Sequence, residues 1–154
     1  MNTSVRYSGC LLGLAVGDAL GVPAEGRVPG SFPPIRGMSG GGRLNLSPGQ
    51  WTDDTSMALC LAESLVTCGR FDPADQMTRY LRWRREGHFA STGRCFGIGQ
   101  TVAQALRTFE KTREPYCGST DASAAGNGCI MRLAPVPMFF ADDPAAAVRW
   151  SAES

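Results

Sequence analysis

The first apolar segment, residues 5–21, carries a glycine at every fourth position: Gly9, Gly13, Gly17 and Gly21. Residues spaced by four lie on one side of an α-helix, so the segment predicts a helix with a glycine stripe. A glycine inside a helix costs about 1 kcal/mol relative to alanine, so four of them need a structural reason. Close approach of a neighbouring helix supplies one. We therefore expect this helix to be central to the core rather than on the surface.

The other apolar segments also follow helical spacing, and none alternates apolar and polar residues as a strand does. Besides residues 5–21, the expected helices are residues 54–68, 73–86, 100–111 and 144–152, together with a segment from residue 129 that is bent or cut by Pro135 and Pro137. The connecting loops are expected at residues 22–50, 87–99 and 113–128. The sequence thus predicts an all-α domain.

The composition is that of an ordinary globular domain. The 154 residues are enough for one domain, which would bury ~70% of the surface that the unfolded chain exposes. Hydrophobic residues make up 43% and charged residues 19%, which argues against disorder. The net charge of +1 gives little support to binding of nucleic acid or a membrane surface.

The six cysteines form no CxxC pair, and His88 is the only histidine. A Cys/His zinc site is therefore not expected, and we expect a reduced, cytoplasmic protein. The run CLLGLAVG resembles the apolar part of a signal sequence, but it continues through Asp18 with no clear cleavage site, which favours a buried helix. No run approaches the ~20 apolar residues of a membrane span, so no membrane is expected.

Several charged or titratable residues lie in the expected helices and loops. Asp18 interrupts the apolar pattern of residues 5–21, and a buried carboxylate has to be paired. We expect Asp18 to have a structural role or to orient a neighbouring site. His88 is assigned no role. The arginines of residues 73–86 are expected on a solvated face; they are Arg79, Arg82, Arg84 and Arg85.

Residues 51–65, WTDDTSMALCLAESL, place two adjacent carboxylates directly before an apolar helical run. One explanation is capping: Thr52 or Asp53 can accept hydrogen bonds from the first turn, and the helix dipole favours carboxylates there by ~0.3–1 kcal/mol each. The other is a cation site, because a threonine hydroxyl and two carboxylates are hard oxygen ligands that suit Mg²⁺ or Mn²⁺. Two divalent ions would bring four positive charges against the two negative charges of Asp53 and Asp54. A dinuclear site would therefore need further carboxylates.

Four stretches occur in an informative order: GCLLGLAVGDALGVPAEG, WTDDTSMALCLAESL, STGRCFGIGQT and GNGCIMRLAPVP. In this order they resemble the ADP-ribosylglycohydrolase family, which includes the dinitrogenase-reductase-activating glycohydrolases, over nearly the whole chain. The resemblance implies an orthogonal all-α bundle with a dinuclear Mg²⁺ or Mn²⁺ centre. It also implies hydrolysis of an ADP-ribosyl bond at C1″ of the distal ribose, in an ADP-ribosylated protein or a small ADP-ribose derivative.

The resemblance also implies metal ligands. By motif position these are Thr52, Asp53 and Asp54. Hydrolysis at an anomeric carbon passes through an oxocarbenium-like state and needs an activated water. A metal ion can lower the pKa of that water, and a nearby carboxylate can accept or donate the proton.

Two further elements of the expected site lie in loops. Glu25 matches an acidic residue near the ions and the scissile bond, which implies a catalytic role; without the resemblance it reads equally as a solvated carboxylate. Gly126, Asn127 and Gly128 match a loop that holds ADP-ribose, and glycines let backbone N–H groups approach phosphates closely. The same three residues are also compatible with a simple turn before a helix.

Two features depart from the family pattern. Family domains are longer, and their second half carries another Asp-x-Asp-Thr group that completes the metal pair. Residues 1–154 are therefore expected to be the N-terminal half of such a domain and to bind at most one ion, weakly. In addition, Gly97 stands where many relatives have an aspartate close to the ions.

These departures leave two hypotheses. The first is a hydrolase of ADP-ribosyl bonds that is impaired by the missing half and by Gly97. The second is a catalytically inactive module that binds ADP-ribose or has a structural role. A helical core built for a longer domain should also leave apolar surface exposed, so we expect the chain to self-associate.

Overall fold

The computed structural model describes residues 2–154, and their regular structure is helical, with a single isolated antiparallel bridge between Gly41 and Leu46. The all-α prediction is confirmed. The elements are α1 (Thr3–Gly21), η1 (Val22–Ala24), α2 (Asp53–Cys68), α3 (Pro73–Glu86), α4 (Gln100–Thr112), η2 (Ala122–Ala124), α5 (Gly128–Met131), α6 (Pro135–Phe139) and α7 (Pro144–Glu153).

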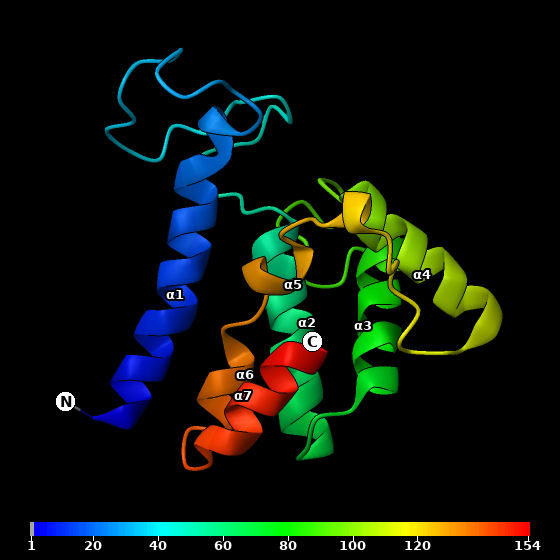
Figure 1. Ribbon diagram of the computed structural model, residues 1–154. Helices are drawn as coiled ribbons and strands as arrows, with labels where there is room; N and C mark the ends of the chain where they lie inside the picture. The colour runs from blue at the N-terminus through cyan, green and yellow to red at the C-terminus, as the bar shows by residue number, and fades with distance from the viewer. Residues whose placement is uncertain (1) are drawn as a thin grey trace.

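The centre of the bundle is α2, which contacts α1, α3, α5 and α6 (Figure 1). Its stripe of Met57, Leu61 and Leu65 is at most 1% exposed, as the helical spacing predicts. Aromatic and aliphatic side chains from α3, α4 and α6 complete the core around this stripe; among them are Tyr80, Leu81, Trp83, Leu106, Phe109 and Val136. The position of α2 matters for function because its first turn carries the acidic motif.

The helix boundaries follow the expected local signals. The left-handed residues Gly69 and Gly87, with φ of 65° and 72°, end α2 and α3, a conformation that glycine adopts without steric penalty. Pro73 begins α3, and Asp72 caps it by accepting a hydrogen bond from the backbone N–H of Asp75. Pro135 separates α5 from α6.

The helix expected over residues 5–21 forms as α1, but the prediction that it is central to the core is wrong. Among its residues only Ala19 is buried, and Figure 1 shows α1 at one side of the bundle. A Cβ atom added at any of the four glycines would meet nothing within 4 Å, so no helix approaches the glycine stripe within residues 2–154. The glycine pattern is compatible with a close neighbour, but it does not specify which part of a protein provides one.

The apolar character of α1 was also underestimated. Residues Thr3–Ala24 form a 22-residue helical segment that contains an 18-residue stretch with a mean hydropathy of 1.3, and the segment is long and apolar enough to cross a membrane. Core helices and signal sequences share this property, so it does not by itself indicate a membrane protein. The side chain of Asp18, within this segment, is hydrogen-bonded to the start of α2.

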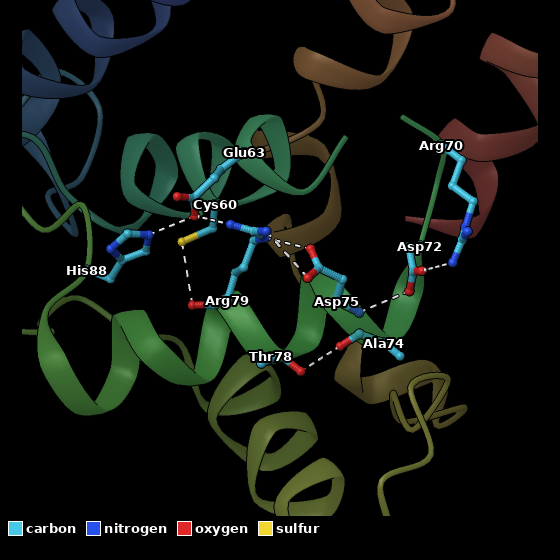
Figure 2. Close-up of polar contacts among 9 residues, drawn as sticks. All are labelled: Cys60, Glu63, Arg70, Asp72, Ala74, Asp75, Thr78, Arg79 and His88. Carbon is cyan, nitrogen blue, oxygen red and sulfur yellow. Dashed lines mark hydrogen bonds and ion pairs between the residues drawn. The ribbon is translucent and has the colours of Figure 1, made fainter. Parts of the chain in front are cut away.

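Polar contacts join α2 to α3, and they correct the prediction that Arg79 is solvated (Figure 2). The Arg79 side chain is 11% exposed and forms ion pairs with Glu63 on α2 and with Asp75 one turn earlier on α3. His88, which the sequence left without a role, places Nε2 2.8 Å from Oε2 of Glu63. We call the group of Glu63, Asp75, Arg79 and His88 the α2–α3 network.

Candidate active site

A cavity of about 680 Å³ lies where the end of α1 meets the start of α2. It brings together residues that the sequence predicted separately. Its lining includes Asp18, Glu25, Thr52, Asp53, Asp54, Gly97 and Asn127, which come from five different segments of the chain. The three predicted metal ligands and the predicted catalytic Glu25 therefore share one cavity.

The start of α2 is capped by another helix rather than by its own N-cap side chain. Thr52 is the N-cap residue, but its side chain makes no capping hydrogen bond. Instead Asp18 accepts hydrogen bonds from the backbone N–H groups of Thr52 and Thr55 at 3.0 and 3.1 Å. The expectation that Asp18 is paired is confirmed. Because this acid supplies the cap, the side chains of Asp53 and Asp54 are not needed for capping.

Trp51 fixes the backbone just before the acidic motif. Its indole Nε1 donates to the carbonyl of Phe89 at 3.1 Å, and its own carbonyl accepts from the hydroxyl of Ser91 at 2.6 Å. Phe89 has a left-handed φ of 59°, which is uncommon for a side chain of this size. Sequence reasoning missed these contacts, because nothing in the residue pattern pairs Trp51 with positions about forty residues later.

The electrostatics of the cavity are those of crowded carboxylates. Burial raises the pKa of Asp53 to about 7, and the negative charges of Asp54, Asp18 and Glu25 act in the same direction. The pKa of Asp54 is also raised, first by burial and then by the charge of Asp18. A cation in this cavity would favour the charged form of both carboxyls and so oppose these upward shifts in pKa.

Glu25 lines the same cavity from the segment that follows η1. Its side chain is 40% exposed, and Oε1 lies 3.5 Å from Nη2 of Arg43. Arg43 is itself 73% exposed, so this ion pair is open to solvent and weak. Glu25 is therefore free to reorient within the cavity.

Gly97 lies directly beside Asp53. Its φ is 74°, and a Cβ atom built on it would be 2.8 Å from Oδ1 of Asp53. A side chain at this position would be strained by the backbone and would also displace the Asp53 carboxylate. The sequence placed residue 97 near the predicted ions, and the cavity lining agrees with that position.

The predicted ADP-ribose loop lies at a second cavity of about 550 Å³. Gly126, Asn127 and Gly128 all line it, together with residues of α4. Asp53 and Asn127 line both cavities, so the two adjoin at the start of α2. An extended ligand could therefore place one end at the acidic motif and the other along the glycine-rich loop.

The oxygen donors match the chemistry of Mg²⁺ or Mn²⁺, but they form an incomplete ligand set. Thr52, Asp53 and Asp54 offer hard oxygen atoms in one cavity with an excess of negative charge. In the part of the chain that the structure describes, no group of three or more His, Cys, Asp or Glu side chains is arranged to hold a metal ion. Any ion held here would need ligands from water, substrate or further protein.

Comparisons with known proteins agree with the all-α fold and with the family resemblance. The family model for ADP-ribosylglycohydrolase matches residues 1–154. An ADP-ribosylarginine hydrolase of Serratia proteamaculans is 46% identical over 87% of this chain and 36% of the relative. The ADP-ribosyl-[dinitrogen reductase] glycohydrolase of Rhodospirillum rubrum is 36% identical over 94% of this chain and 48% of the relative.

A solved structure described as an ADP-ribosylglycohydrolase-related protein complex superposes with a TM-score of 0.80 at 48% identity, covering 97% of this chain and 48% of that chain. The chain thus spans half or less of the length of the proteins it matches.

Proposed function

The chain belongs to the ADP-ribosylglycohydrolase family, and we propose that it contributes the acidic half of a metal-dependent site that hydrolyses an ADP-ribosyl glycosidic bond. The observation that carries this proposal is the shared cavity of Glu25, Thr52, Asp53 and Asp54. The names of the relatives support the reaction, because they are hydrolases of ADP-ribosyl bonds.

Each residue of the site has a chemical task in this proposal. Thr52, Asp53 and Asp54 would hold a Mg²⁺ or Mn²⁺ ion, which supplies a bound water of lowered pKa. Glu25, which lines the same cavity from the segment after η1, would move a proton to or from the reacting water or leaving group. Gly126, Asn127 and Gly128 would hold the pyrophosphate end of ADP-ribose in the adjoining cavity.

The first substrate to test is an ADP-ribosyl-arginine linkage, because the relatives at 46% identity are named for it. The expected result is release of ADP-ribose that depends on Mn²⁺ or Mg²⁺ and is lost in Asp54→Ala. The chain spans about half of its relatives, so we expect a rate well below that of a full-length relative assayed in parallel.

A second function is favoured by a specific observation: Gly97 stands against Asp53, and the acidic ligand set is incomplete. These features suit a module that binds ADP-ribose without turning it over. Binding of ADP-ribose with no metal dependence and no hydrolysis would favour this alternative. Hydrolysis that requires both the ion and Asp54 would exclude it.

A further inference from the structure

The carboxylate of Asp18 joins the end of α1 to the start of α2. It accepts from the Thr52 hydroxyl at 2.8 Å and from the Thr55 hydroxyl at 2.6 Å, in addition to both backbone N–H groups. Two of these four donors belong to Thr52, the first of the predicted metal ligands. One side chain of α1 thus sets the position of the whole first turn of α2.

These hydrogen bonds are also the polar attachment of α1. Within residues 2–154, no other side chain of α1 makes a hydrogen bond or ion pair with a different element. The apolar attachment is small, because Ala19 is the only buried residue of the helix. The docking of α1 therefore depends heavily on Asp18.

The direction of the Thr52 hydroxyl depends on Asp18 as well. A hydroxyl carries one proton, and two acceptors compete for it: Asp18 Oδ1 at 2.8 Å and Asp54 Oδ2 at 3.2 Å. The contact to Asp18 is the shorter, so we expect the hydroxyl to donate to Asp18 rather than to Asp54. The lone pairs of Thr52 and the carboxylate of Asp54 are then both available to a cation.

Charge links this arrangement to the ion. When α1 is docked, Asp18 adds a negative charge to a cavity that already holds Asp53, Asp54 and Glu25. Without a cation these charges repel one another and oppose docking. A divalent cation among them attracts all of these carboxylates, so the electrostatic contribution to docking of α1 becomes favourable. Ion binding and docking of α1 then stabilise each other.

We propose that Asp18 is a positioning residue that couples divalent-ion binding at the start of α2 to the docking of α1. The proposal rests on the proposed function, because it presumes that Thr52, Asp53 and Asp54 bind an ion. Since α1 leads through η1 into the segment of Glu25, the same coupling would help to keep Glu25 at the cavity when the ion is bound.

The test measures Mn²⁺ affinity by calorimetry and hydrogen exchange of residues 5–17 with and without Mn²⁺, on the full chain. For the unchanged chain we expect Mn²⁺ to slow exchange in this segment of α1. For Asp18→Asn we expect the Mn²⁺ affinity to fall about 10–100-fold, as for other residues that orient metal ligands. The Mn²⁺-dependent slowing of exchange should be lost as well.

Two variants separate coupling from a general loss of structure. Asp143→Asn removes a negative charge from another helix cap, that of α7, and should leave both measurements unchanged. Thr55→Val removes one donor to Asp18 without touching a predicted ligand, and should weaken Mn²⁺ binding less than Asp18→Asn does. It also provides the test if Asp18→Asn does not fold.

The outcomes distinguish this proposal from the proposed function. If the unchanged chain binds Mn²⁺ but exchange of α1 does not respond and Asp18→Asn binds equally well, the coupling is overturned and the metal site stands. If the unchanged chain binds no Mn²⁺, both are overturned.

Discussion

Gly97 leaves the space that the carboxylate of Asp53 occupies. A single methyl group on Gly97 would come within 2.8 Å of Oδ1 of Asp53, and the φ of 74° already disfavours a side chain there. The glycine at position 97 therefore does more than leave out an acidic side chain. It accompanies a backbone conformation that suits glycine and a particular position of Asp53.

Replacing Gly97 by alanine should weaken Mn²⁺ binding because the new methyl group displaces the Asp53 carboxylate. Gly93→Ala is a matched control, since Gly93 has the same φ of 74° but no atom within 4 Å of an added Cβ. Both variants should lose about 1–2 kcal/mol of stability from the left-handed backbone. Calorimetric titration should show reduced affinity only for Gly97→Ala; equal affinities would mean that Asp53 does not bind the ion from its present position.

The α2–α3 network should contribute measurably to stability. Arg79→Gln leaves Glu63 and Asp75 without their guanidinium partner, and hydrogen bonds to charged groups contribute about 1.5–3 kcal/mol each before solvent screening. We expect a net loss of about 1–2 kcal/mol in urea unfolding. Arg82→Gln, whose side chain is 46% exposed, should change stability by less than about 0.5 kcal/mol. Similar losses for both variants would contradict the structural role assigned to Arg79.

The same network predicts a dependence of stability on pH. Burial alone would raise the pKa of Glu63, but hydrogen bonds from His88 and Arg79 outweigh it and lower the pKa below its ordinary 4.5. Burial would likewise raise the pKa of Asp75, but the hydrogen bond from Arg79 outweighs it and lowers the pKa below 3.8. A carboxyl whose pKa is lower in the folded state stabilises the fold above its unfolded pKa and loses that contribution as pH falls through the folded value.

Stability should therefore decline as pH falls below about 4.5, and the decline should be shallower in Glu63→Gln. Urea unfolding at a series of pH values from 7 to 3 measures this. Parallel curves for the two proteins would show that Glu63 is not responsible.

The exposed face of α1 should promote self-association. Val5, Leu12 and Val16 are 58%, 64% and 51% exposed, and they form part of an apolar helix surface. Light scattering after size-exclusion chromatography should detect oligomers or aggregates whose proportion drops in a Leu12→Lys, Val16→Lys double variant. Val66→Lys, at a 76% exposed position of α2, serves as the control. A monodisperse, cooperatively melting monomer for the unchanged chain would contradict this expectation.

The sequence predicted the local structure well because its signals are local. The boundaries of α3 follow from Pro73 and Gly87, and the buried face of α2 follows from Met57, Leu61 and Leu65. The sequence likewise predicts that the acidic motif lies at the start of a helix and that Asp18 is paired, and the structure agrees with both predictions.

The sequence could not predict features that depend on distant neighbours. The glycine stripe of α1 looked like a packing surface, yet nothing approaches it within residues 2–154. Arg79 looked solvated because the sequence does not show that Glu63, on another helix, faces it. The contact of Trp51 with Phe89 is of the same kind, and so is the capping of α2 by Asp18 rather than by Thr52.

The central claim is that the acidic start of α2 binds a hard divalent ion. Isothermal titration of the chain with MnCl₂, compared with Asp53→Asn and Asp54→Asn, tests it most directly. The account predicts weak uptake of at most one ion per chain, reduced in each variant. No uptake by the unchanged chain, or uptake that neither substitution alters, would contradict it.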